Sequence, residues 1–401
     1  MSEEFPQTLD ATVLSEEASK MQTFLLSKII GQPKAVEQFV KVYQQISVGM
    51  NKENRPAGIF LFTGPTGVGK TELVRQAAQF VLGRKDAITR IDCGEFQASH
   101  EISKLLGSPP GYVGFADKES VRLSQEKLDQ YQTAAHKINF LLFDEIEEAH
   151  ETLLSAILQI LDAGRLTLGN GSVTDFTKTI IILTSNLGEK EMQQVLTGSG
   201  LGLAPATKSN EDLDDKVYRV SKTAATRYFK AKFMNRIDCM IVFRSLSEAS
   251  LREILKIEMY GVQDRLWRGP YKVWRQTAFD TPVPQFRPIL KLTEVATNFI
   301  IKEGTSQIYG ARELNRVLER LVVFPLGALV GSKQIQDNDI IELDYVAGDT
   351  RLTFRRTGKR DISPLQYVGG SVLGLRKTLE PPKWTPGPAP KPRKPYGYGG
   401  L

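Results

Sequence analysis

The chain has 401 residues, of which 41% are hydrophobic and 24% are charged, a composition typical of a globular protein with two or three domains. Its two cysteines, Cys93 and Cys239, form neither a Cys-x-x-Cys motif nor a metal-ligand pattern, which argues against a disulfide scaffold and a zinc site. The first 20 residues lack the apolar core of a secretory signal, and no run is apolar for long enough to cross a bilayer. We therefore expect a cytoplasmic protein without a membrane partner.

The net charge of +6 is concentrated at the carboxyl end of the chain. Residues 376–401 contain six basic side chains and one acidic side chain, so the rest of the chain carries only about +1. A nucleic-acid-binding domain usually has a basic patch on its folded surface. The nearly neutral body therefore argues against nucleic acid as the partner.

The amino-terminal part of the chain predicts two helices followed by a series of strands. The helices fall within residues 15–50 and are separated at Gly31, which ends one helix, and Pro33, which begins the next. Five apolar runs then alternate with helical or loop segments: "GIFLFT" (58–63), "ITRID" (88–92), "INFLLFDE" (138–145), "TIIILTSN" (179–186) and "CMIVF" (239–243). Continuous apolar runs are typical of strands buried on both faces. The pattern predicts an α/β fold with a doubly wound parallel sheet of five strands.

After residue 245 the pattern predicts a second, smaller and mostly helical α+β domain. Helices are expected over 247–267, near 293–303 and near 311–332, and strands over 339–346 and 350–356. The expected domains are an N-terminal extension (1–20), a large domain (21–245), a small domain (246–357) and a linker with a basic tail (358–401).

Two segments of the carboxyl-terminal half have unusual compositions. The tail 377–401 is rich in proline and glycine, which predicts disorder or polyproline II, as a docking segment or as a solvated tail. Residues 267–288 are rich in aromatic residues and arginine and look like an insertion into the small domain. That composition suits a partner surface, and a local packing flap is the alternative.

A phosphate-binding loop is predicted by "GPTGVGKT" at residues 64–71, which matches the full G-x-x-x-x-G-K-T motif. It follows an apolar strand and precedes a helix, the context in which backbone N–H groups converge on phosphates. We expect ATP as the ligand, with Lys70 on its β- and γ-phosphates and Thr71 holding Mg²⁺. The candidate nucleotide-binding residues are Gly64, Pro65, Thr66, Gly67, Val68, Gly69, Lys70, Thr71 and Glu72.

Polar residues that end two other predicted strands complete this candidate site. Asp144 and Glu145 follow "INFLLF", and we expect Asp144 to bind Mg²⁺ directly or through water and Glu145 to polarise the attacking water. Asn186 ends the next strand and is a candidate for orienting that water. Taken alone, two acids at a strand end are more simply explained as solvated caps.

With these strands in order, the chain resembles AAA+ P-loop ATPases of the Clp family of protein unfoldases, most closely the second ATPase module of ClpB- and ClpA-type proteins. The resemblance covers roughly residues 20–350 and rests on eight motifs in order: "IIGQ" (29–32), "GPTGVGKTEL" (64–73), "GSPPGYVGF" (107–115), "LLFDEIEEAH" (141–150), "ILQILDAGRLT" (157–167), "TSNLG" (184–188), "FMNRID" (233–238) and "YGAREL" (309–314). It implies an ATPase that unfolds proteins. Because there is one phosphate loop, it also implies a single ring.

The resemblance assigns roles to residues outside the phosphate loop. Ile30 and Gly31 are implied as adenine contacts, Arg236 as an arginine finger that acts on the neighbouring subunit, and Arg312 as a sensor of the γ-phosphate. A finger that acts in trans implies a homo-oligomeric ring, and the family expectation is a hexamer. The usual Pro-Glu pair before "FMNRID" is replaced here by Ala231 and Lys232.

Two loop segments carry the expected contacts with other proteins. In the resembling family the loop that contains Tyr112 and Val113 lines the central channel and grips a protein substrate. Leu201-Gly202-Leu203 has the form of the tripeptide with which some unfoldases dock onto a ClpP-like peptidase. A flexible loop with two chance leucines is the alternative explanation for that tripeptide.

Three functions follow from these features. The first is an ATP-dependent protein unfoldase or remodelling chaperone. The second is the same motor as the ATPase subunit of a ClpP-like protease, with or without an adaptor. The third is a dedicated assembly factor for one partner complex, which contacts it through the proline-rich tail. The joint presence of Lys70, Glu145, Arg236 and Arg312 argues against an inactive scaffold.

Overall fold

The computed structural model describes residues 10–107, 121–197, 210–272, 287–304 and 310–359. Contacts along the chain define one compact unit of residues 1–358 and a second of residues 359–401, of which only Lys359 is among the described residues. The division of the first unit into a large and a small domain at residue 245 stays a prediction.

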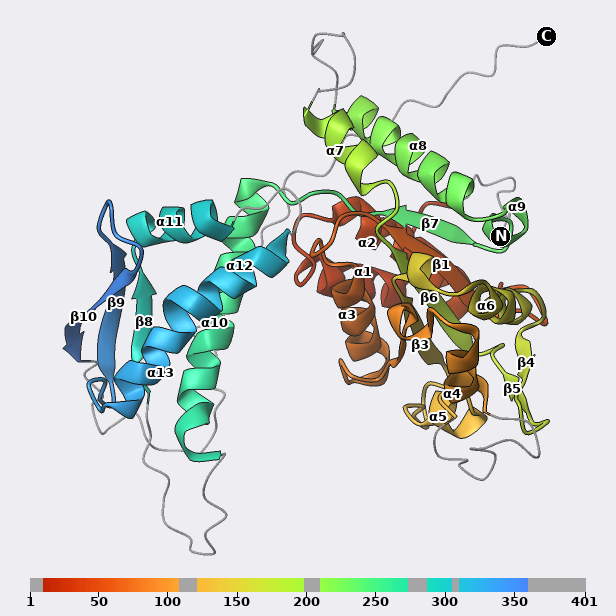
Figure 1. Ribbon diagram of the computed structural model, residues 1–401, viewed down its shortest axis with the longest axis horizontal. Coiled ribbons are helices and arrows are strands. Elements are labelled where there is room, and N and C mark those ends of the chain that lie inside the picture. The colour runs from red at the N-terminus through yellow and green to blue at the C-terminus, as the bar shows by residue number, and fades with distance from the viewer. Residues whose placement is uncertain (1–9, 108–120, 198–209, 273–286, 305–309, 360–401) are drawn as a thin grey trace, which may run out of the picture. The chain divides into compact units, whose positions relative to one another are not determined.

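A parallel sheet of five strands forms the centre of the amino-terminal half (Figure 1). Its strands are β1 (Gly58–Thr63), β2 (Thr89–Asp92), β3 (Asn139–Asp144), β6 (Thr179–Ser185) and β7 (Cys239–Val242), in the spatial order β2-β3-β6-β1-β7. Neighbouring strands are parallel throughout. Every residue of β1, β3 and β6 is buried, which explains why these runs are apolar without alternation. The predicted five-stranded parallel sheet is confirmed.

Alternate residues of each strand enter two separate hydrophobic cores. Phe60 and Phe62 of β1 pack with α1 (Glu16–Leu26), α2 (Pro33–Ser47) and α3 (Lys70–Leu82) on one face. Ile59 and Leu61 pack on the other face, where α6 (Glu151–Ala163) and buried residues of α8 (Asn210–Tyr228) and α9 (Ala231–Met234) join the core. Helices therefore cover both faces, as the doubly wound prediction requires.

The break between the first two helices has a local cause. Ser15 caps α1, because its hydroxyl accepts a hydrogen bond from the backbone N–H of Ala18 at 3.2 Å. Gly31 has φ +76°, a left-handed conformation that favours glycine, and Pro33 then occupies the first position of α2. The predicted separation of the two helices is confirmed.

The carboxyl-terminal half has its own core and its own sheet, and its helical and β content confirms the predicted class (Figure 1). Its elements are α10 (Glu248–Lys272), β8 (Ile289–Leu292), α11 (Glu294–Gly304), α12 (Ala311–Leu318), a π-helical turn (Glu319–Val323), α13 (Phe324–Gly331), β9 (Asp339–Tyr345) and β10 (Leu352–Lys359). Strand β8, which the sequence analysis does not include, pairs in parallel with β9. Its four residues are too few to show a period.

Several smaller elements were not predicted from the sequence. They are a β-hairpin of β4 (Arg165–Thr167) and β5 (Val173–Asp175), the helices α4 (Ser103–Leu106), α5 (Gln125–Asp129) and α7 (Glu189–Thr197), and the 3-10 turns Cys93–Phe96, Ser99–Ile102 and Ile146–Glu148. Helix α8 is the longest of the elements that were not predicted. A buried pair of hydroxyls, Thr63 at the end of β1 and Ser221 on α8, joins this helix to the sheet at 2.7 Å. In the described part of the chain, no helix combines the length and the apolar character that crossing a bilayer requires.

Replacing Phe60 by alanine tests the core between the sheet and α2. The Phe60 ring is fully buried, and its centroid lies 4.9 Å from that of Phe39 and 6.1 Å from that of Phe62. We expect Phe60→Ala to lower the free energy of unfolding by about 3–5 kcal/mol, because it removes buried surface and leaves a cavity. Urea unfolding measures this loss. Val48→Ala, at an exposed position, is the control and should change it by less than about 0.5 kcal/mol.

Candidate nucleotide-binding site

The predicted phosphate loop joins β1 to α3 and contains three glycines in left-handed or related conformations. Gly64, Gly67 and Gly69 have φ values of +143°, +74° and +105°. A Cβ on Gly64 would lie 2.4 Å from the carbonyl oxygen of Phe243, so the loop passes too close to the end of β7 for any side chain. Gly69 is the N-cap of α3. The loop therefore presents the first turn of α3, whose free N–H groups favour an anion.

Lys70 lies inside this loop and is only 9% exposed. Its Nζ donates hydrogen bonds to the carbonyl oxygens of Gly64 and Pro65, the latter at 3.0 Å, and to Oδ1 of Asn186 at 2.7 Å. Burial lowers the pKa of Lys70 to about 8, against the attraction of nearby carboxylates. The ammonium group thus joins the ends of β1 and β6, in a position that phosphate oxygens would compete for.

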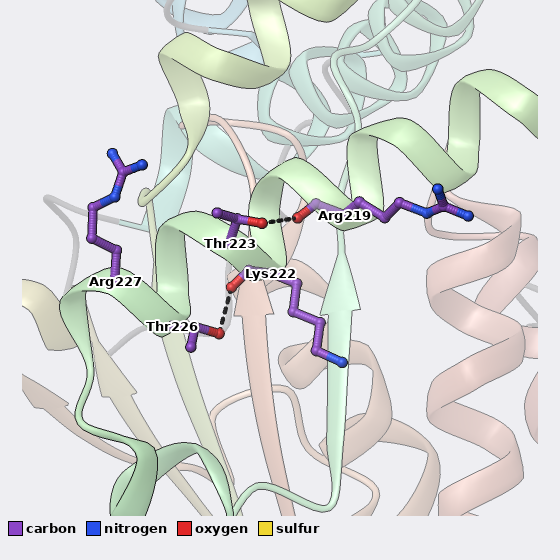
Figure 2. Close-up of a pocket in the computed structure, with 5 residues that line it drawn as sticks. All are labelled: Arg219, Lys222, Thr223, Thr226 and Arg227. Atoms are coloured by element: carbon purple, nitrogen blue, oxygen red, sulfur yellow. Dashed lines mark hydrogen bonds between the residues drawn. The ribbon is translucent and has the colours of Figure 1, made fainter.

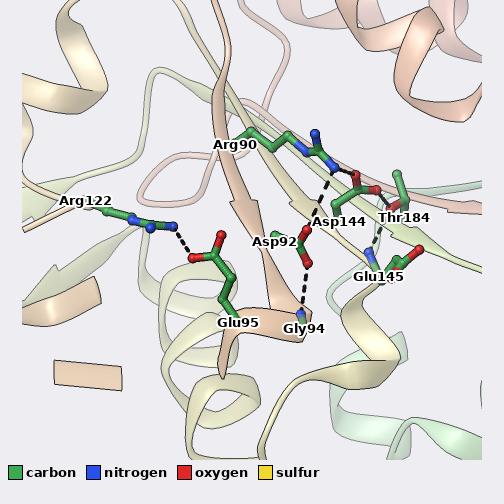
Figure 3. A network of polar contacts seen from close by, with 8 residues as sticks. All are labelled: Arg90, Asp92, Gly94, Glu95, Arg122, Asp144, Glu145 and Thr184. Atoms are coloured by element: carbon green, nitrogen blue, oxygen red, sulfur yellow. Dashed lines mark hydrogen bonds and ion pairs between the residues drawn. The ribbon is translucent and has the colours of Figure 1, made fainter. Parts of the chain in front are cut away.

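Asp144 ends β3 with both carboxylate oxygens engaged, as Figure 3 shows. Thr184 of β6 donates its hydroxyl proton to Oδ1, and Arg90 of β2 donates to Oδ2 at 2.6 Å. The next residue, Glu145, has φ +55°, which turns the chain sharply at the strand end. Its backbone N–H donates to the Thr184 hydroxyl at 3.1 Å. The two acids therefore leave the same strand end in different directions.

Asn186 connects Lys70 to a further acid that the sequence analysis does not name. The backbone N–H of Asn186 donates to Oε1 of Glu147 at 2.7 Å. Burial raises the pKa of Glu147, and its second carboxylate oxygen has no hydrogen-bond partner within the described residues. Lys70, Asn186 and Glu147 thus form one polar chain across the ends of β1, β6 and β3.

The segment "IIGQ" reaches the phosphate loop through Gln32 rather than through the two residues singled out from the sequence. Buried Gln32 donates to the carbonyl oxygens of Val68 at 3.2 Å and Arg244 at 2.8 Å, and it accepts from the Arg244 N–H at 3.1 Å. Ile30 is half-buried and Gly31 is exposed beside this contact. Gln32 therefore ties the loop to the segment that follows β7.

Helix α12 begins against the phosphate loop, and this places Arg312 near Lys70. The Ala311 N–H donates to the carbonyl oxygen of Gly67 at 3.1 Å. A Cβ on Gly310 would lie 2.8 Å from the carbonyl oxygen of Thr66. Arg312 is exposed, and its charge contributes to the lowered pKa of Lys70. The structure thus brings Arg312 close to the site, where its positive charge acts on Lys70.

Arg236 has a different environment. Its side chain forms an ion pair with Asp162 at the end of α6, and its carbonyl oxygen accepts from Arg55 at 2.7 Å. Arg55 also lies 3.7 Å from Asp238. Among the described residues, these contacts do not include the phosphate loop of the same chain. The arrangement separates Arg236 from the cluster around Lys70.

The remaining predicted site residues divide into two groups. Thr71 and Glu72 lie half-buried in the first turn of α3, and Glu72 accepts a hydrogen bond from Gln76 at 2.6 Å. The predicted pore residues, Tyr112 and Val113, lie outside the described residues. The predicted docking tripeptide, Leu201-Gly202-Leu203, also lies outside them.

Three contributors to the site, Gln32, Arg90 and Glu147, carried only a weak signal in the sequence. Arg90 is the exposed residue of a short strand of mixed composition, Thr-Arg-Ile-Asp, and Gln32 precedes a helix whose first residue is proline. Glu147 is one of several acids that follow β3. Their contacts depend on which strands are neighbours, which a single sequence does not state.

A separate open hollow lies along α8, and Figure 2 shows the five residues that line it. The two threonines donate their hydroxyl protons to backbone oxygens one turn earlier, so the exposed donors are the basic side chains. None of the predicted site residues lines this hollow. Its lining consists of Arg219, Lys222, Thr223, Thr226 and Arg227.

A glycine loop between a buried strand and a helix, beside a strand that ends in Asp-Glu, defines the chain as a P-loop nucleotide-binding protein. A family model described as an AAA domain of the Cdc48 subfamily matches residues 55–240. A second model, described as the C-terminal, D2-small domain of ClpB protein, matches residues 287–343. The chain belongs to the Clp family of AAA+ proteins.

Curated relatives support this assignment. One relative, from Cyanidium caldarium, is named ATP-dependent Clp protease ATP-binding subunit ClpA homolog. The two sequences are 36% identical over 332 residues, and the alignment covers 82% of this chain and 36% of that protein. The chain is 33% identical over 331 residues to Chaperone protein ClpB 1 of a Nostoc species, which covers 82% of this chain and 32% of that protein. The chain thus spans about a third of the length of these relatives.

Solved structures show the same fold. A Saccharomyces cerevisiae Hsp104:casein complex in an extended conformation matches with a TM-score of 0.67 and 28% identity, over 85% of this chain and 53% of that one. A closed-state reconstruction of Hsp104 with ATPγS and casein matches with a TM-score of 0.66 and 29% identity, over 84% and 52% of the two chains.

The lowered pKa of Lys70 predicts a proton uptake when nucleotide binds. Its pKa is about 8 in the free protein, below the ordinary value of 10.5, so the amine is mostly neutral at about pH 9. Phosphate oxygens favour the charged form and raise the pKa again, so binding at about pH 9 should take up about one proton. Calorimetry in two buffers of different ionisation enthalpy measures this uptake. Lys85→Met, at an exposed position, should retain it, and a buffer-independent binding enthalpy would contradict the prediction.

Proposed function

We propose that the protein is an ATP-dependent protein unfoldase that hydrolyses ATP between subunits of a ring and pulls polypeptide through its centre. One observation carries the proposal. Lys70, beyond the loop that follows β1, bonds to Asn186 at the end of β6 and is attracted by Asp144 at the end of β3, all at the carboxyl edge of the sheet. In open α/β sheets this edge is where ligands bind. Membership of the Clp family adds the motor function.

The residues of the site fit ATP and Mg²⁺. Lys70 and the N–H groups of α3 would hold the phosphates, and the segment of Ile30 and Gly31 would contact adenine. Thr71 and Asp144 offer only oxygen ligands, which Mg²⁺ prefers, and Mg²⁺ would neutralise phosphate charge during transfer. Among the described residues, no group of three or more His, Cys, Asp or Glu side chains is placed to hold a metal by itself. That agrees with a metal held mainly by the nucleotide.

Hydrolysis would use Glu145 and Asn186. Glu145 is half-buried at a sharp turn beyond β3, from which its carboxylate would accept a proton from the attacking water. Asn186 is held in place from both sides, by Lys70 and by Glu147, and would orient the same water. The bond to Glu147 does not involve Lys70 and would remain when phosphates bind, which favours such a positioning role.

The arginines support a ring. Arg312 lies close to the nucleotide site of its own chain, whereas Arg236 is held elsewhere by Asp162 and Arg55. An arginine finger that acts on a neighbouring subunit needs this separation. Head-to-tail contacts of this kind close into a ring, and we propose a hexamer.

Tyr112 and Val113 would contact the protein substrate in the channel of that ring. The structures of Hsp104 with casein, a protein ligand, support this part of the proposal. Nucleic acid is not part of it, because the positive charge is concentrated in the tail. A cytoplasmic location stays a prediction, since some relatives are named as chloroplastic. The role of an assembly factor for one partner stays an alternative.

A second candidate function is the delivery of unfolded substrates to a ClpP-like peptidase. The observation that favours it is the printed name of the Cyanidium caldarium relative, an ATP-binding subunit of a Clp protease. Leu201-Gly202-Leu203 would be the docking element on this chain.

Two substitutions separate ATP hydrolysis from unfolding. Glu145→Gln should lower ATP turnover at least about a hundredfold while nucleotide binding persists, because it removes the base. Tyr112→Ala should leave ATP turnover nearly unchanged but abolish the unfolding of a tagged fluorescent protein. Phosphate release and loss of fluorescence measure the two activities. Glu148→Gln, at an exposed neighbouring position, is the control for the first variant. Normal unfolding by Tyr112→Ala would refute the channel role.

A peptidase assay decides the second candidate. We expect wild-type protein to stimulate degradation of a tagged substrate by a ClpP-like peptidase, and replacement of Leu201 and Leu203 by alanine to abolish the stimulation. ATP turnover should stay the same, because the tripeptide lies outside the phosphate-binding loop and the acidic strand end. If wild-type protein neither binds nor stimulates the peptidase, delivery is excluded.

A further inference from the structure

Among the described residues, Arg90 is the charged side chain in direct contact with Asp144. Strands β2 and β3 are neighbours, with Arg90 paired to Leu142 and Asp92 paired to Asp144 in register. The guanidinium Nη2 lies 2.6 Å from Oδ2 of Asp144 and 4.0 Å from Oδ2 of Asp92 (Figure 3). One cation thus stands between two carboxylates.

The contact with Arg90 is the more exposed of the two that occupy Asp144. The Thr184 hydroxyl is buried and also holds the backbone of Glu145, so it is part of the turn at the strand end. The Arg90 side chain is 48% exposed, whereas that of Asp144 is 11% exposed. Water can therefore compete for the guanidinium side of this ion pair. Arg90 is therefore the partner that Asp144 can give up.

Asp92 lies where it can accept the Arg90 guanidinium. Its Oδ1 accepts a hydrogen bond from the Gly94 N–H at 3.1 Å, which holds the carboxylate in place. Its Oδ2 faces Arg90 at 4.0 Å, just beyond the range of a hydrogen bond. A small rotation of the Arg90 side chain would exchange one carboxylate for the other.

We propose that Arg90 is a positioning residue that neutralises Asp144 before nucleotide binds and moves to Asp92 when Mg²⁺ arrives. This inference rests on the proposed ATP site. A doubly charged cation outcompetes a single charge for a carboxylate at short range. Without an alternative acceptor, the displaced guanidinium would remain beside the metal and repel it. Asp92 would accept the guanidinium and relieve that repulsion. Arg90 and Asp92 together would thus set the Mg²⁺ concentration at which the site is half-saturated.

Titrations of a fluorescent, slowly hydrolysed ATP analogue with and without Mg²⁺ test this exchange. Arg90→Ala should lower the half-saturating Mg²⁺ concentration about fivefold, because the competitor is gone. The same variant should weaken binding in excess chelator, because uncompensated carboxylates then repel the phosphates. Arg90→Lys keeps the charge and should restore both values to within about twofold of wild type.

A double-mutant cycle separates the exchange from a general charge effect. Asp92→Asn should raise the half-saturating Mg²⁺ concentration in the wild-type background but leave it unchanged in the Arg90→Ala background. Arg84→Ala, which breaks a 2.6 Å ion pair with Asp86 between exposed side chains, is the control and should change neither titration. Thermal unfolding of each variant checks that the fold is retained.

The possible outcomes are distinct. A wild-type protein that does not bind the analogue would overturn the proposed function and this inference together. Binding by the wild type with equal losses in Arg90→Ala with and without Mg²⁺ would show a merely structural role and overturn this inference alone. An additive effect of Asp92→Asn and Arg90→Ala would overturn the transfer to Asp92.

Discussion

A buried ammonium group holds the site together. Lys70 donates to carbonyl oxygens of its own loop and to Asn186 on another strand, and Asn186 in turn bonds to Glu147 beyond a third strand. Burial destabilises the charged form of Lys70 relative to the neutral amine, which lowers the pKa of Lys70. The contacts are satisfied only when the three strand ends lie side by side, so the site and the sheet depend on each other.

The polar contacts of the site can exchange partners. Lys70 and Asp144 both contact other protein groups, Asn186 and Arg90. Each of these groups must be displaced or re-paired when phosphates and a metal enter. Arg90 also has a neighbour, Asp92, that can take up the change. Polar contacts near the site are therefore exchangeable, whereas the apolar strands beneath them are fixed.

Much of the fold was predictable because burial on both faces leaves a strong mark on sequence. Strands β1, β3 and β6 are buried at every position and mostly apolar, and their bounds agree closely with the predicted runs. Strand β8 and the hairpin of β4 and β5 were missed because they are short and mostly exposed or half-buried, so no buried apolar run marks them. Helix α8 is polar over much of its length, so no apolar run marked it.

The sequence by itself determined the chemistry of the site, because the phosphate loop, Asp144-Glu145 and Asn186 each stand at the end of a recognisable strand. Tertiary structure alone decided which groups meet. The order β2-β3-β6-β1-β7 brings Arg90 to Asp144 and Asn186 to Lys70, over separations of 54 and 116 residues. Strand order depends on how helices pack on both faces of the sheet, a collective property that no short motif encodes.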